Sequence, residues 1–320
     1  NMKIGIVGAT GEVGQMMIKN LEEFSVPATE LRLFASARSA GKEVLFNKKS
    51  LTVEELTEGK MREKYDYLLF SAGSAISKVF APIAAEAGNI VIDNSSAFRR
   101  DKNIPLIVPE INGGQLKGYR GIIANPNCST IQIALALNVI KQHFDIKRVI
   151  ITTMQSVSGA GHHGIAILEE QRKGSTDIGI FPQHIDLNVI PQIGAFEDDS
   201  YCEEEHKLQF EMQRILSAPD LEISSTVTRV PVMRGHSASV FVQLQKEIEI
   251  EKLHEAFKNS PAIQYNEDYM TPYYLNNSND SHVSRLRYAF DKSSIQFWNV
   301  ADNVRLGAAT NAVKIMLNMR

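Results

Sequence analysis

Residues 2–14 read MKIGIVGATGEVG, an apolar run followed by glycines at positions 8, 11 and 14. The apolar run is typical of a buried strand, and the amphipathic pattern of Glu12–Phe24 predicts a helix directly after it. Glycines at such a turn permit a tight bend, close approach of the backbone to a pyrophosphate, and close packing of helix on strand. The spacing GxxGxxG departs from the usual GxGxxG, and an ordinary glycine turn has the same composition. We interpret the stretch as a dinucleotide-binding turn.

The remainder of the first 150 residues alternates strand patterns with helical ones. Apolar runs follow at Leu31–Phe34, Tyr67–Phe70 and Ile90–Ile92, with a helical pattern at Ala75–Ala87. This alternation predicts an α/β domain with a Rossmann-like, doubly wound parallel sheet. Beyond Phe144 the chain becomes rich in β patterns, and Ser237–Glu249 alternates apolar and polar residues. A second, α+β domain is therefore expected, followed by a helix over Asp302–Met319.

Composition excludes several classes of protein. The chain has 320 residues, enough for about two domains, and 43% of them are hydrophobic, as in globular proteins. Lys and Arg number 34 against 37 Asp and Glu, so the formal net charge is -3, which argues against nucleic-acid and membrane-surface binding. Two cysteines are too few for a disulfide scaffold. Because a strand pattern begins at Met2, we expect no signal peptide and a cytoplasmic protein.

The segment after the second predicted strand bears on the choice of dinucleotide. An acidic residue there would bind the ribose 2′-hydroxyl of NAD, but the segment reads Phe34-Ala35-Ser36-Ala37-Arg38-Ser39. Hydroxyls and a guanidinium suit a 2′-phosphate instead. Ser36, Arg38 and Ser39 therefore favour NADP, with a solvated loop arginine as the alternative.

Cys128 and His236 are the candidate catalytic pair. Cys128 lies in NPNCST (125–130) at about the first position of a predicted helix, where the helix dipole lowers a thiol pKa. His236 precedes the alternating strand and is a candidate base for the thiol. The alternative interpretations are a small buried cysteine for Cys128 and a structural histidine for His236. We interpret Cys202 as a small buried cysteine. The pair His162-His163 lacks a metal-binding pattern, so no metal is expected.

Several blocks together resemble aspartate-β-semialdehyde dehydrogenases over nearly the whole chain. In chain order they are GATGEVG (8–14), IDNSSAFR (92–99), VPEIN (108–112), NPNCST (125–130), QSVSGAG (155–161), NVIPQI (188–193), RVPVMRGHS (229–237) and ADNVRLGAATNAV (301–313). The resemblance implies reversible oxidation of L-aspartate 4-semialdehyde to L-4-aspartyl phosphate with NADP and phosphate, through a thioester on Cys128. It places this reaction in the biosynthesis of lysine and diaminopimelate, threonine and methionine, in a homodimer.

The resemblance also implies roles for single residues. Cys128 would be the nucleophile and His236 the acid/base. Gln155, Glu204 and Arg229 would bind the substrate, and Arg99 and Lys207 the phosphate. The cofactor would contact Gly8, Thr10, Gly11, Glu12, Val13, Ser36, Arg38, Ser39, Ser158, Gly159 and Asn303. His162-His163 and Leu306, where the family often has Lys, depart from the family pattern, and Glu203 and Glu205 flank Glu204.

The resemblance suggests that one domain is built from two separate segments of the chain, and it leaves rival functions open. Residues 1–127 and 302–320 would form the NADP-binding domain, and 128–301 the catalytic and dimerisation domain. An N-acetylglutamyl-phosphate reductase would share the Cys–His chemistry, but its substrate lacks the free ammonium that an acid opposite Arg229 would bind. A glyceraldehyde-phosphate dehydrogenase has a different cysteine block. A non-catalytic NADP-binding sensor would need neither Cys128 nor His236.

Overall fold

The structure is a computed structural model that describes residues 2–320, and the chain forms two compact units. The first unit extends to Pro126 and includes Ala308–Arg320, and the second is Asn127–Gly307. The return of the chain to the first unit, expected near residue 302, is therefore at Ala308. A π-helical turn at Arg305–Ala309 precedes the last α-helix and accounts for the later return.

The first unit contains a seven-stranded sheet in the order β3-β4-β2-β1-β5-β6-β7. Its strands are β1 (Met2–Val7), β2 (Ala28–Ala35), β3 (Glu43–Phe46), β4 (Lys49–Glu55), β5 (Tyr67–Phe70), β6 (Ile90–Asp93) and β7 (Ile122–Ala124). All neighbouring strands are parallel except β3 and β4. Without β3, the order is that of a Rossmann sheet, which confirms the predicted doubly wound fold.

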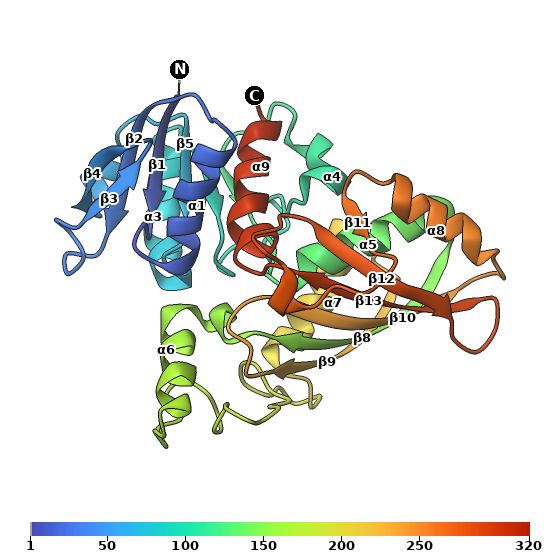
Figure 1. Cartoon of the computed structure of the whole chain (residues 1–320). Helices are drawn as coiled ribbons and strands as arrows, with labels where there is room; N and C mark the ends of the chain where they lie inside the picture. The colour runs from blue at the N-terminus through green and yellow to red at the C-terminus, as the bar shows by residue number, and fades with distance from the viewer. Residues whose placement is uncertain (1) are drawn as a thin grey trace. The chain divides into compact units, whose positions relative to one another are not determined.

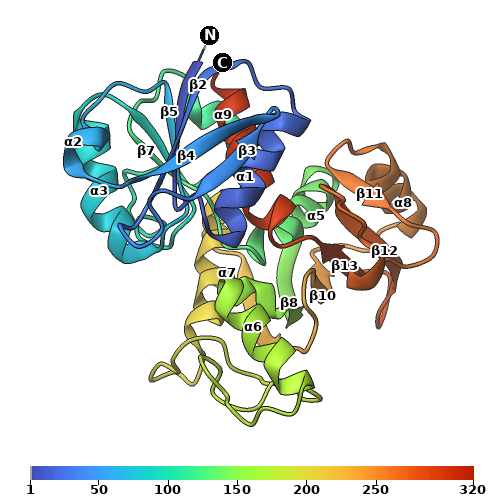
Figure 2. The same ribbon diagram turned by 60° about the vertical axis from the view of Figure 1, so that its left-hand side comes forward.

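Helices cover both faces of this sheet (Figures 1 and 2). One face carries α1 (Glu12–Glu23) and α9 (Thr310–Asn318), which lie side by side. The hydroxyl of Thr310 donates to Oδ1 of Asn20 at 2.8 Å and joins these two helices. The other face carries α2 (Glu58–Met61) and α3 (Ser74–Glu86), and α4 (Pro109–Asn112) contacts α9.

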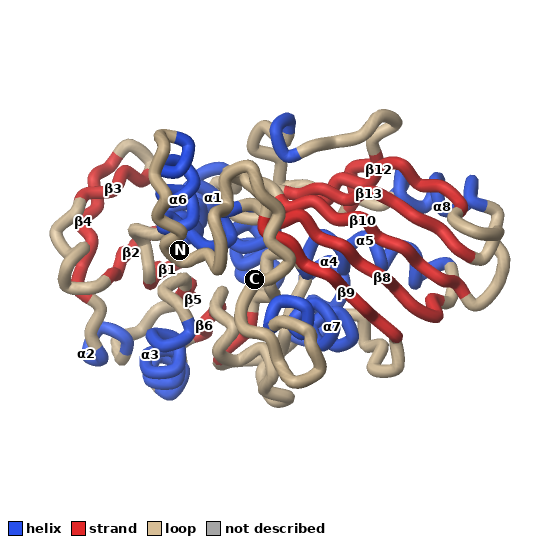
Figure 3. Tube along the Cα trace, turned by 90° about the horizontal axis from the view of Figure 1, so that it is seen from below, coloured by secondary structure: helices blue, strands red, loops and turns tan. Residues whose placement is uncertain are grey.

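The second unit contains a six-stranded mixed sheet in the order β11-β12-β13-β10-β8-β9. Its strands are β8 (Ile146–Gln155), β9 (Glu222–Arg229), β10 (His236–Leu244), β11 (Ile263–Tyr265), β12 (Ser281–Tyr288) and β13 (Ser294–Ala301). The helices packed against this sheet are α5 (Thr130–His143), α7 (Glu203–Ile215) and α8 (Ile250–Asn259) (Figure 3). The helix α6 (Gly161–Arg172) contacts the preceding 3-10 turn Val157–Ala160.

The alternation predicted after His236 is present in β10. Ala238, Val240, Val242 and Leu244 are at most 2% exposed, and the residues between Val240 and Leu244 are half-buried. The strand ends at Leu244, earlier than the pattern to Glu249 suggested. In residues 2–320, no helix combines the length and the apolarity needed to cross a membrane.

Candidate active site

The order of strands in the second sheet gathers polar side chains at one edge. β8 and β9 are parallel neighbours, and their last residues, Gln155 and Arg229, are paired in register. β10 runs antiparallel to β8 and begins at His236 on this same edge. β13 is antiparallel to β10 and ends at Ala301, which is paired in register with His236. Asn303 therefore follows β13 at this same edge. Sheet topology alone thus brings together four residues to which the resemblance assigns a role.

Cys128 reaches this edge from the turn before α5. The helix begins at Thr130, two residues later than the sequence suggested. Asn127 closes the turn, because its side-chain oxygen accepts the Ser129 N–H at 2.9 Å and its carbonyl accepts the Thr130 N–H at 3.0 Å. The Sγ atom of Cys128 lies 3.2 Å from Nε2 of His236. A thiol and an imidazole that are 108 residues apart in sequence are therefore in hydrogen-bonding contact.

His236 is buried, with 1% of its surface exposed. Burial, assisted by the nearby charge of Arg229, holds the pKa of His236 well below its ordinary value. Burial therefore favours the neutral imidazole. The Nδ1 atom accepts the backbone N–H of Ser156 at 3.0 Å.

Two carboxylates of α7 face the Cys128 turn. The Asn127 N–H donates to Oε1 of Glu211 at 2.6 Å, and the Asn127 side-chain amide donates to Oε1 of Glu204. The flanking acids lie elsewhere: Glu203 is exposed, and Glu205 accepts the Cys202 and Val227 N–H groups at 2.9 and 3.1 Å. Among the three consecutive acids, Glu204 is the one that faces the Cys128 turn.

Arg229 and Gln155 add buried hydrogen-bonding groups to this edge. Arg229 donates Nη1 to the Ser156 carbonyl at 2.9 Å. Burial lowers the pKa of Arg229, while the charges of Glu204 and Cys128 raise it, so all three are electrostatically coupled. Gln155 is fully buried, and within residues 2–320 its Nε2 has no hydrogen-bond partner. A buried amide donor without a partner is expensive, which suits a group that binds a ligand.

Gly159 explains why this edge can be compact. An added Cβ would lie 2.7 Å from Nη1 of Arg229 and 3.3 Å from Nε2 of His236. Any larger residue would displace both side chains. Asn303 and Ser158 are adjacent, since Asn303 Nδ2 donates to Oγ of Ser158 at 3.0 Å.

The two residues expected to bind phosphate lie in different units. Lys207 stands on α7, one turn after Glu204. Arg99 follows β6 and is buried, donating to the carbonyls of Asn94 and Asn125 at 2.9 Å each. Two backbone carbonyls of the first unit therefore hold the Arg99 guanidinium in place.

The glycine turn of the first unit has the steric features that a dinucleotide requires. Gly8 has a φ of +85°, and a Cβ there would lie 2.2 Å from the Ser71 carbonyl oxygen. A Cβ at Gly14 would lie 2.0 Å from the Gly8 carbonyl oxygen, so helix and turn are in direct contact. At Gly11 the nearest atom is 3.6 Å away, and no described side chain caps α1 there. Thr10, Glu12 and Val13 occupy this same turn and the start of α1, which leaves a helix N-terminus suited to phosphate.

The turn after β2 carries Ser36, Arg38 and Ser39. The Ser39 N–H donates to the Ser36 carbonyl at 2.9 Å, which closes the turn and leaves Ser36 and Arg38 exposed. β1 and β2 are parallel, and the Gly8 N–H donates to the Phe34 carbonyl at 2.9 Å. The glycine turn and the Arg38 turn therefore lie at the same edge of the first sheet.

Two family models match the chain. Residues 3–119 match the NAD binding domain of semialdehyde dehydrogenases, and residues 137–306 match their dimerisation domain. Aspartate-semialdehyde dehydrogenases from Campylobacter jejuni and Aquifex aeolicus are each 42% identical to this chain, covering 98% of it and 96% of their own length. The chain belongs to the aspartate-semialdehyde dehydrogenase family. The chain also matches the crystal structure of aspartate semialdehyde dehydrogenase II from Vibrio cholerae complexed with ASA, with a TM-score of 0.96 and 41% sequence identity. The match covers 100% of this chain and 98% of the chain in that structure.

In this member of the aspartate-semialdehyde dehydrogenase family, the other cysteine has a structural place. Cys202 is fully buried at the start of α7, where its sulfur accepts a backbone N–H and its own N–H donates to Glu205. Burial raises the pKa of the Cys202 thiol, and the charge of Glu205 raises it further. Cys202 is thus a poor nucleophile compared with an exposed thiolate.

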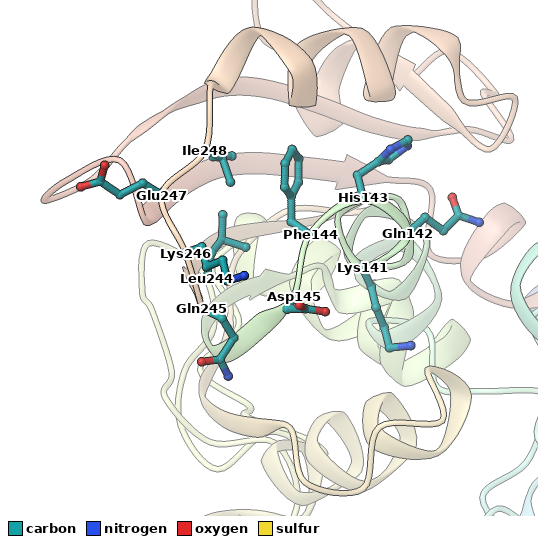
Figure 4. Close-up of a pocket in the computed structure, with 10 residues that line it drawn as sticks. All are labelled: Lys141, Gln142, His143, Phe144, Asp145, Leu244, Gln245, Lys246, Glu247 and Ile248. Atoms are coloured by element: carbon teal, nitrogen blue, oxygen red, sulfur yellow. The ribbon is translucent and has the colours of Figure 1, made fainter.

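Other sequence candidates lie apart from Cys128. His162 and His163 are exposed at the start of α6, and in the described chain no three His, Cys, Asp or Glu side chains converge as metal ligands. A hollow of about 290 Å³ is lined by Lys141–Asp145 and Leu244–Ile248, and Figure 4 shows these residues. It lies where β8 begins and β10 ends, the ends opposite to Gln155 and His236.

Sequence reasoning did not single out several residues that hold Cys128 and His236. Asn127 and Ser156 stand beside predicted residues, within the blocks NPNCST and QSVSGAG. Glu211 follows Glu204 by seven residues, which places both on one face of α7. Gly307 lies in the π turn, and a Cβ there would lie 2.7 Å from the Cys128 carbonyl oxygen. Only the close approach of two backbones requires a glycine at this position.

Proposed function

We propose that this protein catalyses the reversible, phosphate-dependent oxidation of L-aspartate 4-semialdehyde to L-4-aspartyl phosphate with NADP as cofactor. The observation that carries the proposal is the contact of 3.2 Å between Sγ of Cys128 and Nε2 of His236, beside Arg229. The membership in the family supports the substrate. In the biosynthetic direction the reaction reduces aspartyl phosphate on the route to lysine, threonine and methionine.

Cys128 performs the covalent chemistry in this proposal. Its thiolate adds to the aldehyde carbon and forms a hemithioacetal, and after loss of hydride the acyl group remains on Cys128 as a thioester. Phosphate then attacks the thioester carbon and releases the sulfur. His236 is the acid/base partner that the resemblance implies, and it contacts the sulfur directly.

The substrate amino acid group is recognised by opposite charges. Arg229 binds the α-carboxylate, Glu204 binds the α-ammonium, and the unpartnered amide of Gln155 donates to the substrate. A buried acid near a buried arginine favours a substrate with both an ammonium and a carboxylate. N-Acetylated substrates lack the ammonium and would leave Glu204 without its cationic partner.

The cofactor is held by the first unit. Backbone groups from Gly8 to Val13 would hold the pyrophosphate, and Ser36, Arg38 and Ser39 would hold the 2′-phosphate. When bound, NADP would accept a hydride in the oxidation and return it in the reverse reaction. Ser158, Gly159 and Asn303 belong to the second unit and are assigned to the nicotinamide end on the resemblance alone.

The direct test of the function is NADP reduction by the purified protein with L-aspartate 4-semialdehyde. Absorbance of NADPH is followed with and without inorganic phosphate, and N-acetylglutamate semialdehyde serves as the comparison substrate. We expect turnover of the aspartate compound that depends on phosphate. Turnover of the N-acetylated compound alone would assign the protein to the rival reductase.

The choice of NADP over NAD depends on Arg38 in this proposal. An Arg38→Ala variant loses a charge-assisted contact of about 1.5–3 kcal/mol, which is roughly a ten- to hundredfold loss of NADP preference. The ratio of kcat/KM for NADP and NAD measures this preference. Lys19→Ala removes a positive charge from the exposed side of α1 and is the control. Equal use of NADP and NAD by the parent protein would refute the assignment.

Phosphate binding is assigned to Arg99 and Lys207. In Lys207→Ala and Arg99→Lys we expect the apparent KM for phosphate to rise about tenfold or more, with a smaller change for the semialdehyde. Arg100→Ala, which changes the exposed neighbour of Arg99, is the control. If the KM for the semialdehyde rises instead, these residues bind the substrate carboxylate and the two anion assignments are exchanged.

A homodimer is proposed from the match to a dimerisation domain over residues 137–306. The face of the second sheet opposite α5 carries Ile150 with 48% of its surface exposed. In a homodimer, contact with the second copy would cover this apolar side chain. The mass of the protein in solution, measured by sedimentation, tests the proposal.

A further inference from the structure

The hydrogen bonds of His236 determine which of its ring nitrogens carries the proton. The backbone N–H of Ser156 points at Nδ1 from 3.0 Å. A backbone N–H is only a donor, so Nδ1 must offer its lone pair. A neutral imidazole has one proton, and this proton is then on Nε2. Nε2 is the nitrogen that lies 3.2 Å from Sγ of Cys128.

The Ser156 N–H is held rigidly in this position. The next two residues are anchored because the Val157 and Ser158 N–H groups donate to the Val232 and Met233 carbonyls at 2.9 and 3.1 Å. The Ser156 carbonyl accepts from Arg229 at 2.9 Å. The donor therefore keeps its direction without help from a ligand.

Asn303 joins the segment of Ser156 to that of His236. Its Oδ1 accepts the Gly235 N–H at 2.8 Å and the Ser156 hydroxyl at 3.1 Å, while its Nδ2 donates to Ser158 at 3.0 Å. Asn303 is 2% exposed, so these bonds form in the interior. The two segments that carry the donor and the acceptor are thus fixed relative to each other.

We propose that the backbone N–H of Ser156 fixes His236 as the tautomer with the proton on Nε2, so that His236 acts on Cys128 as a hydrogen-bond donor. The proposal rests on the proposed function and narrows the acid/base role of His236 within it. The Ser156 hydroxyl oxygen also lies 3.2 Å from Nδ1 and could accept an Nδ1–H, but in that tautomer the buried Ser156 N–H would lose its acceptor and face another donor. Protonation of both nitrogens creates this same conflict, and burial with the charge of Arg229 opposes it further.

The donor role changes the path of the thiol proton. This proton passes to solvent water, because Nε2 already bears a hydrogen, and the resulting thiolate accepts the Nε2–H bond. When the sulfur adds to the carbonyl carbon, a C–S bond forms and the carbonyl π electrons move to oxygen. The Nε2–H then stabilises the negative oxygen, as a donor in an oxyanion hole does. Ser156 is a positioning residue in this scheme.

The tautomer is measured directly by nitrogen NMR on the intact protein labelled with 15N-histidine. Protonated and unprotonated ring nitrogens differ in chemical shift, and the loss of signals in His236→Gln assigns those of His236. We expect Nε2 protonated and Nδ1 unprotonated in the parent protein at neutral pH. An Nδ1 that carries the proton overturns the proposal. Because no substrate is added, this result does not depend on which aldehyde the protein oxidises.

A proline at position 156 removes the donor itself. Ser156 has a φ of −69°, which proline adopts, and the preceding Gln155 ends a strand, as the residue before proline requires. Ser156→Ala keeps the N–H and is the matched control for the lost hydroxyl. We expect Ser156→Ala to keep the Nε2–H tautomer, and Ser156→Pro to lose it with kcat about tenfold or more below that of Ser156→Ala. Equal tautomers and equal kcat in the two variants would overturn the proposal, and the spectrum of the parent decides it if Ser156→Pro does not fold.

Discussion

We expect a Cys128→Ala variant to have no measurable phosphate-dependent oxidation of L-aspartate 4-semialdehyde. The thioester is the only route from aldehyde to acyl phosphate in the proposed mechanism, and alanine cannot form a covalent intermediate. Cys128→Ser should retain at most a trace, because a hydroxyl ionises far less readily than a thiol. The measurements are the rate of NADPH formation and the mass of the protein after rapid quenching, which shows an acyl group on the parent.

The natural control is the other cysteine of the chain. Cys202 is fully buried, and burial raises the pKa of its thiol. Its sulfur caps the start of α7, a position in which serine is favourable. Cys202→Ser should therefore oxidise the semialdehyde at close to the parental rate. An acyl group found on Cys202, or full activity in Cys128→Ala, would contradict the assigned nucleophile.

The parallel sheet could be predicted because its signals are local. Ile4–Val7 and Tyr67–Phe70 are short apolar runs, and the glycines of the first turn have steric causes within a few residues of themselves. The antiparallel strand β3 carries a weaker signal, since only Phe46 of its four residues is buried. Patterns of burial predict elements well only where an element has a buried face.

The last helix shows where local patterns fail. An apolar face suggested one helix over Asp302–Met319, but the chain forms a π turn at Arg305–Ala309 before α9. Asp302 accepts the Val304 and Arg305 N–H groups at 3.0 Å each, which starts this turn. Gly307 then lies against the carbonyl of Cys128, a contact between segments far apart in sequence. No local periodicity contains such information.

The candidate site, too, could be predicted from the sequence only in part. Cys128 and His236 could be chosen from residue type and local context, but the distance between them depends on the pairing of β8 with β10. The resemblance named Glu204 without separating it from its acidic neighbours. Glu203 is exposed, and the hydrogen bonds of the two buried carboxylates now distinguish Glu204 from Glu205. The contribution of Ser156 comes from its backbone, which no side-chain pattern reveals.

Replacing His236 with alanine should lower kcat by roughly 10²–10⁴-fold, the range for losing a positioned acid/base or a donor to a developing oxyanion. It should also slow the alkylation of Cys128 at neutral pH, because the thiolate loses the Nε2–H bond. His143→Ala, which changes an exposed histidine at the far end of α5, should affect neither rate.

The glutamine variant separates the two roles of His236. A glutamine amide is a hydrogen-bond donor, but it does not accept a proton near neutral pH. If His236 acts as a donor, His236→Gln should recover part of the kcat and of the alkylation rate lost in His236→Ala. If His236 acts as a base, glutamine and alanine should be equally slow. Thermal unfolding of each variant shows whether the buried position tolerates the change, and a His236→Ala protein that is folded and fully active would remove His236 from the mechanism.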